Sequence, residues 1–394
     1  MKVVIIGGGF AGIRAAKRLK KHFKVTLIDE NGQFVVRPLL HEYIVGAIPL
    51  DHAVFPYNKI LGDDIEILRG SVTSIDSKER KIRVVTPDST ASITLSYDYL
   101  LVTMGSKANI GEGQEAPHIY DINGAAMAKE DIMAIRDLIR VHKRVSVAIV
   151  GGGPVGVQSA LMIKEMIEYY SEKYHDPNHH QVTIYNSTDH ILSRYNMRIS
   201  SIARRLLVMH NIKVENHSLA RKAERMNNKV TLHYQRDDKL HYTKHDIVLW
   251  AAGKKKPSIG NVTFETDDCL RSRHDRKIFC AGDAAMITLK NRSVPELAQL
   301  ALQQADTAAI NIIRASRSRK LIPYKPKIRG LILSAGYTKG IGLLYKRILL
   351  KDKTAWTVNR IIYATSMFTL KNRIRMIKRW LRYDDKNPYK HLED

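Results

Sequence analysis

Cysteine is scarce in this chain: Cys269 and Cys280 are the only two among 394 residues. Two cysteines exclude a disulfide framework and a cysteine-rich metal centre, and their spacing is not that of a CxxC redox pair. We interpret both as small buried residues. This scarcity indicates a protein of a reducing compartment.

Long apolar segments are also missing. No segment approaches the roughly 18–20 apolar residues that cross a membrane as a helix. The first predicted strand begins at Lys2, so we expect no signal or transit peptide ahead of it. Any contact with a membrane is therefore expected to be peripheral.

Acidic residues are outnumbered, with 39 Asp and Glu against 64 Lys and Arg and a formal net charge of +25. The excess is concentrated in residues 314–382, where 19 basic residues accompany one acid, Asp352. Such a charge favours anionic partners, namely nucleic acid, an acidic membrane surface or a polyanionic ligand. Residues 383–394 turn acidic again and are predicted to form a solvated tail.

Two short motifs of the chain are rich in glycine. One runs from Gly7 to Gly12 and the other from Gly151 to Gly156, each directly after an apolar segment. Each motif predicts a strand, a tight turn and a helix whose N-terminus meets a pyrophosphate. Two such motifs in one chain are far more specific than one, and they indicate an internal duplication. One nucleotide would be a resident cofactor and the other a substrate, which points to a flavin enzyme supplied by a nicotinamide.

The segments around the first glycine motif continue the same pattern. A helix is predicted over Ile13–Phe23 and a parallel strand over Lys24–Ile28. Asp29 ends that strand, where a dinucleotide-binding fold places the carboxylate that binds the adenosine ribose. A solvent-facing acid at a strand end is the alternative interpretation.

Over nearly the whole chain this pattern resembles the flavoproteins with two dinucleotide-binding domains. In that superfamily, strands ending in glycine mark the passages between domains, and Gly105 and Gly253 end the two similar strands here. The resemblance implies a noncovalent FAD, with Asp283 at the ribityl chain and the main chain of Val72 at the adenine. The residues predicted to bind FAD are Gly7, Gly9, Phe10, Gly12, Asp29, Val72, Gly105, Gly282, Asp283 and Ala298.

A narrower resemblance is to the type II NADH dehydrogenases, NADH:quinone oxidoreductases of membrane surfaces. It is carried by Ala298–Gln303, which is similar to that family's AQxxxQ quinone motif, by Tyr324–Gly336, and by an insertion over Glu168–His180. Gln299 and Gln303 are four residues apart, so they share one helix face. Neutral amides suit quinone carbonyls because they leave no charge in an apolar pocket. Two surface glutamines on an amphipathic helix are the alternative.

Two positions depart from that family's pattern. Gln158 stands where the family usually has a glutamate near the nicotinamide and flavin, and Asn186 stands where it has an acid for the ribose hydroxyls. Hydride transfer depends on orientation more than on a general base, so we still expect it. The lost carboxylate weakens the expected preference for NADH over NADPH. The residues predicted at this nucleotide are Gly151, Gly153, Gly156, Gln158, Asn186 and Gly253.

The basic C-terminal region contains a predicted amphipathic helix. Lysines and arginines surround its apolar stripe, and Trp380 lies near the edge, which is typical of a helix lying in a membrane interface. Docking on the protein's own core and a dimer interface are the competing interpretations. The apolar residues recur at steps of three and four: Met367, Leu370, Ile374, Ile377 and Leu381.

We therefore predict an α/β chain with two Rossmann-like dinucleotide-binding domains and a C-terminal amphipathic membrane-binding region. Its expected activity is transfer of a hydride from NADH or NADPH to FAD and of two electrons to a membrane quinone, without proton pumping, with Gln299, Gln303 and Gln158 as the catalytic residues. We expect it on the cytoplasmic face of the cell membrane. The predicted boundaries are 1–108 and 255–330 for the FAD domain, 109–254 for the NAD(P)H domain, 331–382 for the membrane and quinone region, and 383–394 for the acidic tail.

Three other functions are weighed against this one. A sulfide:quinone oxidoreductase needs cysteines at the flavin, and only Cys280 lies in a flavin segment. A soluble NAD(P)H-dependent reductase of an electron-carrier protein would use the basic surface for an acidic partner. A nucleotide-regulated lipid- or nucleic-acid-binding flavoprotein is the alternative of another class, but the basic helix lacks an aromatic platform for bases.

The expected partners are a quinone and an anionic membrane surface, with no nucleic acid and with a homodimer left open. No metal is expected. His175, His179 and His180 are interpreted as part of a solvated loop rather than as a metal site, and Lys254–Lys256 as solvent-facing.

Overall fold

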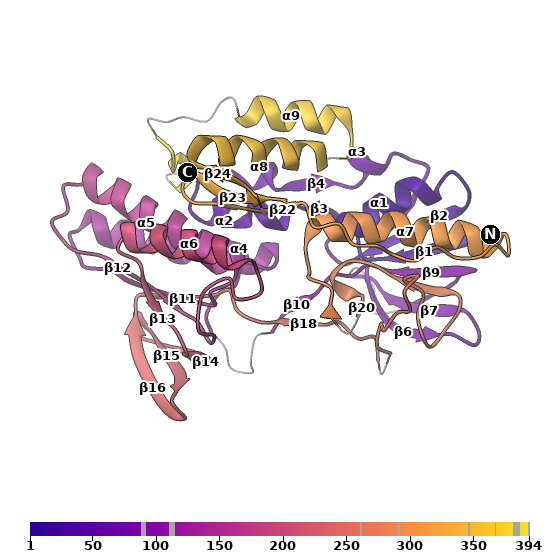
Figure 1. Cartoon of the computed structure of the whole chain (residues 1–394), viewed down its shortest axis with the longest axis horizontal. Helices are drawn as coiled ribbons and strands as arrows, with labels where there is room; N and C mark the ends of the chain where they lie inside the picture. Colours follow the sequence, from indigo (N-terminus) through magenta and orange to yellow (C-terminus); the bar gives the residue numbers. More distant parts are fainter. Residues whose placement is uncertain are drawn as a thin grey trace. The chain divides into compact units, whose positions relative to one another are not determined.

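The computed structural model describes residues 1–87, 92–109, 115–260, 262–289, 292–345, 347–366, 368–380 and 387–392 (Figure 1). The chain divides into two compact units. Unit 1 consists of Met1–Val35, Val54–Lys107 and Lys255–Ile328, and unit 2 of Val36–Ala53, Ala108–Lys254 and Arg329–Asp394. Residues 36–53, which our sequence boundaries assign to the first domain, pack within unit 2. None of the helices within the described ranges is both long and apolar enough to span a membrane.

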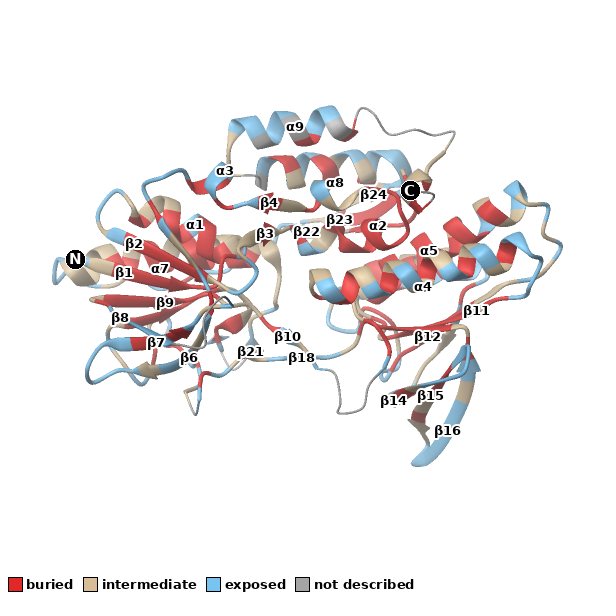
Figure 2. Ribbon diagram, turned by 180° about the vertical axis from the view of Figure 1, so that it is seen from behind, coloured by how far each residue is buried: buried red, intermediate tan, exposed pale blue. Residues whose placement is uncertain are grey.

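Unit 1 is built on a parallel five-stranded sheet with the strand order β19-β9-β1-β2-β5. Val3 in β1 pairs with Val25 on one side and Tyr99 on the other. The inner strands are buried, as their continuous apolar runs require (Figure 2). The strands are β1 (Lys2–Ile6), β2 (Lys24–Asp29), β5 (Glu66–Arg69), β9 (Tyr99–Val102) and β19 (Ile278–Cys280).

Two helices of unit 1 pack against each other beside this sheet: α1 (Phe10–Leu19) and α7 (Ala298–Ser316). The α1 helix starts and ends earlier than the predicted Ile13–Phe23, because Gly9 is already its extended N-cap. The smaller elements of unit 1 are β3 (Gln33–Val35), β4 (Val54–Pro56), α3 (Asn58–Leu61), β6 (Ser71–Asp76), β7 (Lys81–Val85), β8 (Ser92–Ser96), η3 (Gly282–Ala284), β20 (Thr288–Leu289) and β21 (Arg292–Ser293). Strands β10 (Lys107–Ala108) and β18 (Lys254–Lys255) pair at the two chain crossings.

Unit 2 repeats the same plan with a parallel sheet in the order β13-β12-β11-β17. Val147 in β11 pairs with Val182 and Ile247. An antiparallel sheet of three longer strands packs its inner face on this core, with Val230 and Leu232 in the same buried cluster as Trp250 of the parallel sheet. The elements are β11 (Ser146–Val150), β12 (Gln181–Tyr185), β13 (Lys213–Glu215), β14 (Leu219–Met226), β15 (Lys229–Arg236), β16 (Lys239–His245), β17 (Ile247–Trp250), α4 (Ile122–Arg140), α5 (Pro154–Lys173) and α6 (Met197–Met209).

The α5 helix continues to Lys173, so the insertion predicted over Glu168–His180 is a loop only in its second half. His180 in that loop is not solvated: its side chain is 3% exposed and its Nε2 lies 3.1 Å from Asp176 Oδ2. The interpretation of that histidine as solvent-facing is therefore wrong.

The C-terminal part of unit 2 forms an antiparallel sheet on which α8 packs, and α9 lies alongside α8 (Figures 1 and 2). These elements are β22 (Gly330–Ser334), β23 (Gly340–Leu344), β24 (Ile348–Lys351), α8 (Asp352–Ser366) and α9 (Leu370–Trp380). The short helices of residues 36–53, η1 (Arg37–Leu39), α2 (Leu40–Ile44) and η2 (Leu50–His52), belong to the same unit, and α2 packs on α4 and α5.

The last described residues are docked rather than solvated. Tyr389 and Leu392 are fully buried, and the Tyr389 hydroxyl donates to Glu165 Oε2 at 2.9 Å. The main-chain N–H of His391 donates to the carbonyl of Gly46 at 3.3 Å. The prediction of a solvated tail is wrong for residues 387–392, which include η4 (Lys390–Leu392), and its other residues lie outside the described ranges.

Candidate functional site

The first glycine motif forms a tight turn between β1 and α1 that leaves one side open. Gly7 has φ +98°, and a Cβ at this position would lie 2.4 Å from the Cα of Met104. A Cβ on Gly12 would lie 2.0 Å from the Gly7 carbonyl oxygen, whereas a Cβ on Gly9 would meet no atom within 4 Å. The N-terminus of α1 has no side-chain cap. Its main-chain N–H groups therefore border space that suits a pyrophosphate.

Asp29, at the end of β2, is held beside this turn. Its Oδ2 accepts from the N–H of Gly8 at 2.8 Å and its Oδ1 from the N–H of Asn31 at 2.9 Å. The Tyr57 hydroxyl donates to the Gly8 carbonyl at 3.0 Å and occupies the space of a Cβ on Gly8. Phe10 in the first turn of α1 packs edge-on against Phe34, with ring centroids 5.0 Å apart.

The second glycine motif repeats this geometry within unit 2. Gly151 has φ +111°, a Cβ on Gly156 would lie 1.9 Å from the Gly151 carbonyl oxygen, and Gly153 faces open space. Asn186 directly follows the last residue of β12, whereas Asp29 is the last residue of β2. Its Oδ1 lies 2.6 Å from the position of a Cβ on Gly152. Each half therefore places one polar side chain beside the second glycine of its turn, charged in unit 1 and neutral in unit 2.

Asn186 is anchored by its own loop. The side chain is buried, and its Nδ2 donates to the Thr188 carbonyl at 2.8 Å and to Asn216 Oδ1 at 2.9 Å.

The strand-ending glycines also match each other, with φ +73° at Gly105 and +72° at Gly253. Val72 lies in β6, next to an irregularity in its pairing with β7.

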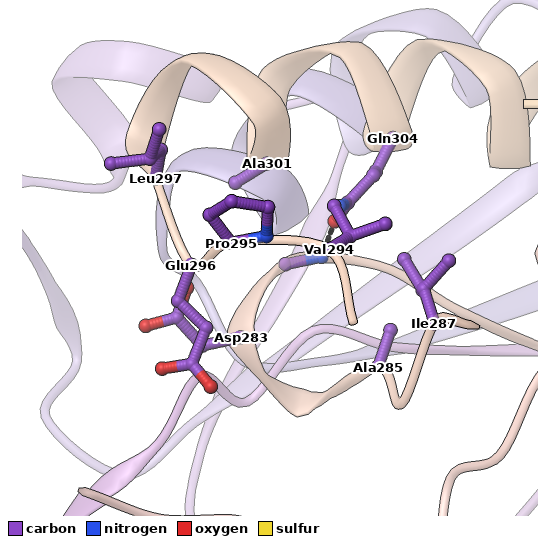
Figure 3. Close-up of a pocket in the computed structure, with 10 residues that line it drawn as sticks. Asp283, Ala285, Ile287, Val294, Pro295, Glu296, Leu297, Ala301 and Gln304 are labelled. Carbon is purple, nitrogen blue, oxygen red and sulfur yellow. Dashed lines mark hydrogen bonds between the residues drawn. The ribbon is translucent and has the colours of Figure 1, made fainter. Parts of the chain in front are cut away.

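A pocket lies between the turn that follows β19 and the start of α7 (Figure 3). The Gly282 N–H donates to Gln304 Oε1 at 2.7 Å, which ties this turn to the helix. The Ser106 hydroxyl donates to Asp283 Oδ2 at 3.2 Å. The pocket is lined by Gly282, Asp283, Ala285, Ile287, Val294, Pro295, Glu296, Leu297, Ala301 and Gln304.

Lys256 is bound to three of the residues that line this pocket. Its Nζ donates to the carbonyls of Asp283 at 2.7 Å and Ala285 at 3.3 Å, and pairs with Glu296 at 2.8 Å. Lys254 and Lys255 are exposed, as interpreted from the sequence, whereas Lys256 is half-buried and bound to the protein. Its contacts are made with segments 27 to 40 residues away, which local sequence could not indicate.

The two glutamines of the AQxxxQ-like segment lie in the first two turns of α7, which begins at Ala298. Gln303 is bound to the neighbouring chain: its Nε2 donates to the Lys327 carbonyl at 2.9 Å, and its Oε1 accepts from the Lys327 N–H at 2.9 Å. This pair of bonds pins residue 327 to α7. The pocket-lining amide is that of Gln304, which the sequence motif did not single out.

Gln158 is buried near the start of α5, two residues after Gly156. Its Nε2 lies 3.2 Å from Nε2 of His41 in α2. His41 is a second residue that sequence reasoning missed, because only the fold brings it near the glycine motif. Among the described residues, no group of three or more His, Cys, Asp or Glu side chains is arranged to hold a metal ion.

Comparisons with known proteins agree with this geometry. Residues 1–305 match the family model described as pyridine nucleotide-disulphide oxidoreductase. An alternative NAD(P)H-ubiquinone oxidoreductase C1 of Arabidopsis thaliana is 25% identical, covering 85% of this chain and 71% of the relative. A type II NADH:quinone oxidoreductase of Staphylococcus haemolyticus is 22% identical, covering 94% and 96%.

Solved structures show the same fold. NDH2 from Plasmodium falciparum in complex with NADH superposes with a TM-score of 0.83 at 17% identity, covering 97% of each chain. The sulfide:quinone oxidoreductase of Aquifex aeolicus gives a TM-score of 0.75 at 17% identity, covering 95% of this chain and 92% of that one. The resemblance to type II NADH dehydrogenases that the sequence indicated is confirmed by these matches. With the family model matching residues 1–305 and both glycine turns formed, this chain belongs to the pyridine nucleotide-disulphide oxidoreductase family.

Proposed function

We propose that this protein is an FAD-dependent oxidoreductase that takes a hydride from NADH or NADPH and delivers two electrons to a quinone. The observation that carries the proposal is the pair of matching glycine turns, one in each unit, each with its own polar side chain at the end of the following strand. Two separate dinucleotide sites suit one retained cofactor and one exchanging substrate.

The residues of unit 1 fit a flavin dinucleotide. The open side of Gly9 and the uncapped start of α1 would receive the pyrophosphate, and Asp29 the adenosine ribose. Asp283 and the N-terminus of α7 at Ala298 would border the ribityl chain and the ring, with the positive end of the helix favouring negative charge there. A bound flavin supplies reversible two-electron chemistry between a hydride donor and a quinone.

The proposal is tested on the purified full-length protein. We expect a flavin absorbance spectrum, release of FAD on denaturation, bleaching by NADH without oxygen, and recovery of the oxidised spectrum when a soluble quinone is added. A colourless protein from which denaturation releases no flavin would contradict the proposal.

We propose that Asn186 lets the enzyme accept both NADH and NADPH, because no carboxylate stands at this position to repel a 2′-phosphate. Asn186→Glu should raise the NADH over NADPH preference roughly tenfold or more, since like charges a few ångströms apart repel by more than 1 kcal/mol. The measurement is kcat/KM for both nucleotides.

Asn186→Gln is the matched control, since it has the size of glutamate without its charge, and it should leave the preference unchanged. If the wild type already rejects NADPH by several orders of magnitude, Asn186 does not control the selectivity.

We propose that Gln299 donates a hydrogen bond to the quinone and that Gln303 supports it by fixing residue 327 on α7. Gln299→Leu should slow flavin reoxidation by quinone about tenfold, the effect of losing one buried hydrogen bond. Flavin reduction by NADH should stay within about twofold, because the nucleotide residues proposed above all lie in unit 2. Gln303→Leu should also slow reoxidation and, unlike Gln299→Leu, lower the melting temperature.

Stopped-flow absorbance separates the two half-reactions. Equal loss of both half-reactions in Gln299→Leu would contradict this assignment. Wild-type reoxidation rates in Gln299→Leu would exclude Gln299 from the quinone site.

We propose that α9 attaches the protein to an anionic, cytoplasm-facing membrane surface. Leu370, Ile374 and Ile377 follow one another on a single face and are 71%, 47% and 45% exposed. Exposed cations flank them at positions 371, 373 and 378. An apolar stripe bordered by cations suits the boundary between acyl chains and anionic headgroups. Met367 and Leu381 of the predicted stripe lie outside the described residues.

Trp380 is not part of this surface. With Met376 it faces the protein and is buried, so its predicted place at the membrane interface is wrong. The α9 helix therefore has two apolar faces, of which one packs on the protein and one is exposed (Figure 2). This arrangement keeps the helix attached to α8 while leaving the other stripe for lipid.

The triple variant Leu370→Gln, Ile374→Gln, Ile377→Gln should weaken binding to phosphatidylglycerol vesicles at least about tenfold, because it removes the apolar area that enters the bilayer. Binding of the wild type should also weaken with salt, since the Debye length falls from about 10 Å at 0.1 M to about 3 Å at 1 M. Vesicle sedimentation measures both effects.

Leu240→Gln with Met226→Gln, which alters exposed apolar residues of the antiparallel sheet, is the matched control. Truncation before α9 would not be a clean test, because it also removes the buried Tyr389 and Leu392. A triple variant that sediments like the wild type, or a wild type that never sediments, would refute the proposal.

A further inference from the structure

The short helix α2 places two titratable side chains in the interior of unit 2. His41 is 4% and Glu42 1% exposed. Glu42 Oε2 accepts a hydrogen bond from Arg360 of α8 at 2.7 Å. The Arg360 guanidinium in turn lies over the rings of Trp356 at 4.9 Å and Trp380 at 5.3 Å. The carboxylate thus has a close cationic partner, while Nε2 of His41 lies 3.8 Å from the other oxygen, Glu42 Oε1, and 3.2 Å from Nε2 of Gln158 in α5.

Two contacts define the hydrogen-bonding state of the imidazole. The ring hydrogen-bonds the main chain of Pro38, which has no N–H and can only accept, so the proton of the neutral ring resides on the nitrogen that donates there, Nδ1. Nε2 is then the acceptor, and the Gln158 Nε2 that lies 3.2 Å from it donates. Burial lowers the pKa of His41 to about 4; Glu42 raises it and Arg360 lowers it, both more weakly. His41 therefore accepts from Gln158 throughout the neutral pH range.

This contact also determines which end of the Gln158 amide is available to a ligand. Within the part of the chain that the structure describes, the hydrogen bond to His41 is the one that the Gln158 side chain makes, and it uses the NH₂ group. The carbonyl oxygen Oε1 is left for a ligand. Gln158 lies one turn beyond the start of α5, where the pyrophosphate of the second nucleotide is proposed to bind.

We propose that His41 is a positioning residue that locks the Gln158 amide so that Oε1 accepts from the carboxamide NH₂ of the nicotinamide. This inference rests on the proposed function and adds a recognition rule to it. A carboxamide offers a donor to Oε1, whereas a carboxylate in its place offers only repelling lone pairs. The enzyme therefore distinguishes NAD⁺ from its nicotinic acid analogue through a residue that does not touch either ligand.

The test is equilibrium binding to the oxidised holoenzyme by isothermal titration calorimetry. The probes are NAD⁺, nicotinic acid adenine dinucleotide and ADP-ribose, which lacks the pyridine ring. The wild type should bind NAD⁺ about tenfold or more tightly than the acid analogue, because the analogue leaves a buried acceptor unpaired. His41→Phe should abolish this discrimination while leaving the affinity for ADP-ribose within about twofold. His41→Gln, whose own oxygen can accept from Gln158, should restore part of it.

A double-variant cycle separates positioning from general damage. Gln158→Leu should lose the discrimination to the same extent as His41→Phe, and the double variant should lose no more, since both changes remove one interaction. The inference would be overturned if His41→Phe still preferred NAD⁺ to the acid analogue, or if the double variant lost as much as the two single variants together. The proposed function would stand in either case. Failure of the wild type to bind NAD⁺ or ADP-ribose would instead reject the nucleotide site itself. If ADP-ribose affinity falls in His41→Phe along with that for NAD⁺, His41 supports the fold and does not orient the amide.

Discussion

Gly12→Val should give a folded protein that does not retain FAD. A Cβ at this position would lie 2.0 Å from the Gly7 carbonyl oxygen and 2.9 Å from Thr103 Oγ1, so α1 has to move away from the turn. That movement displaces the main-chain N–H groups that would face the pyrophosphate. We expect at least a 100-fold loss of FAD affinity, about 2.7 kcal/mol. The measurement is the ratio of flavin to protein after desalting, with the flavin quantified on denaturation.

The same substitution in the other half of the chain is the control for this result. Gly156→Val makes an equivalent clash but in unit 2, so it should retain FAD at the wild-type ratio. A Gly12→Val protein that holds FAD as tightly as the wild type would show that the first glycine turn is not the flavin site.

Gly156→Val should in turn be unable to use NADH although it carries FAD. A Cβ on Gly156 would lie 1.9 Å from the Gly151 carbonyl oxygen, which forces the start of α5 away from the second turn. We expect flavin reduction by NADH to fall at least about 100-fold, as loss of the phosphate contacts would require. Reduction by dithionite and reoxidation by quinone should remain at wild-type rates.

Anaerobic stopped-flow absorbance provides these three rates for one preparation. Calorimetry with ADP-ribose shows independently whether the second site is lost. Normal NADH-dependent bleaching in Gly156→Val would reject the assignment of the second turn to the nicotinamide nucleotide.

The parts of this fold that sequence could predict are those set by neighbouring residues. Apolar strands followed directly by glycine turns have few other ways to fold, and both β1 and β11 lie where their runs of valine and isoleucine end at Gly7 and Gly151. Asp29 and Asn186 could be identified because each ends the next parallel strand, and the structure places each beside its turn. How these residues bind nucleotides stays a prediction.

Residues whose surroundings come from distant segments could not be identified in this way. His41 meets Gln158 across 117 positions, and Gly282 meets Gln304 only because α7 packs beside η3. The acidic composition of residues 383–394 indicated a solvated tail. Tyr389 is nevertheless buried against α5, where its hydroxyl reaches Glu165. The composition of a segment indicates only how polar it is on average. Two buried side chains, here Tyr389 and Leu392, are enough to dock a short segment on the protein.

The equivalence of Asp29 and Asn186 bears on how such enzymes can diverge. Each side chain lies beside the second glycine of its turn, but each belongs to a separate compact unit with its own hydrogen-bonding neighbours. If the two turns bind nucleotides as proposed, a substitution at position 186 would act on the site in unit 2 and leave the hydrogen bonds of Asp29 in unit 1 unchanged. Under the proposed function, the preference for an electron donor would then change through one unit while the flavin site of the other unit is kept.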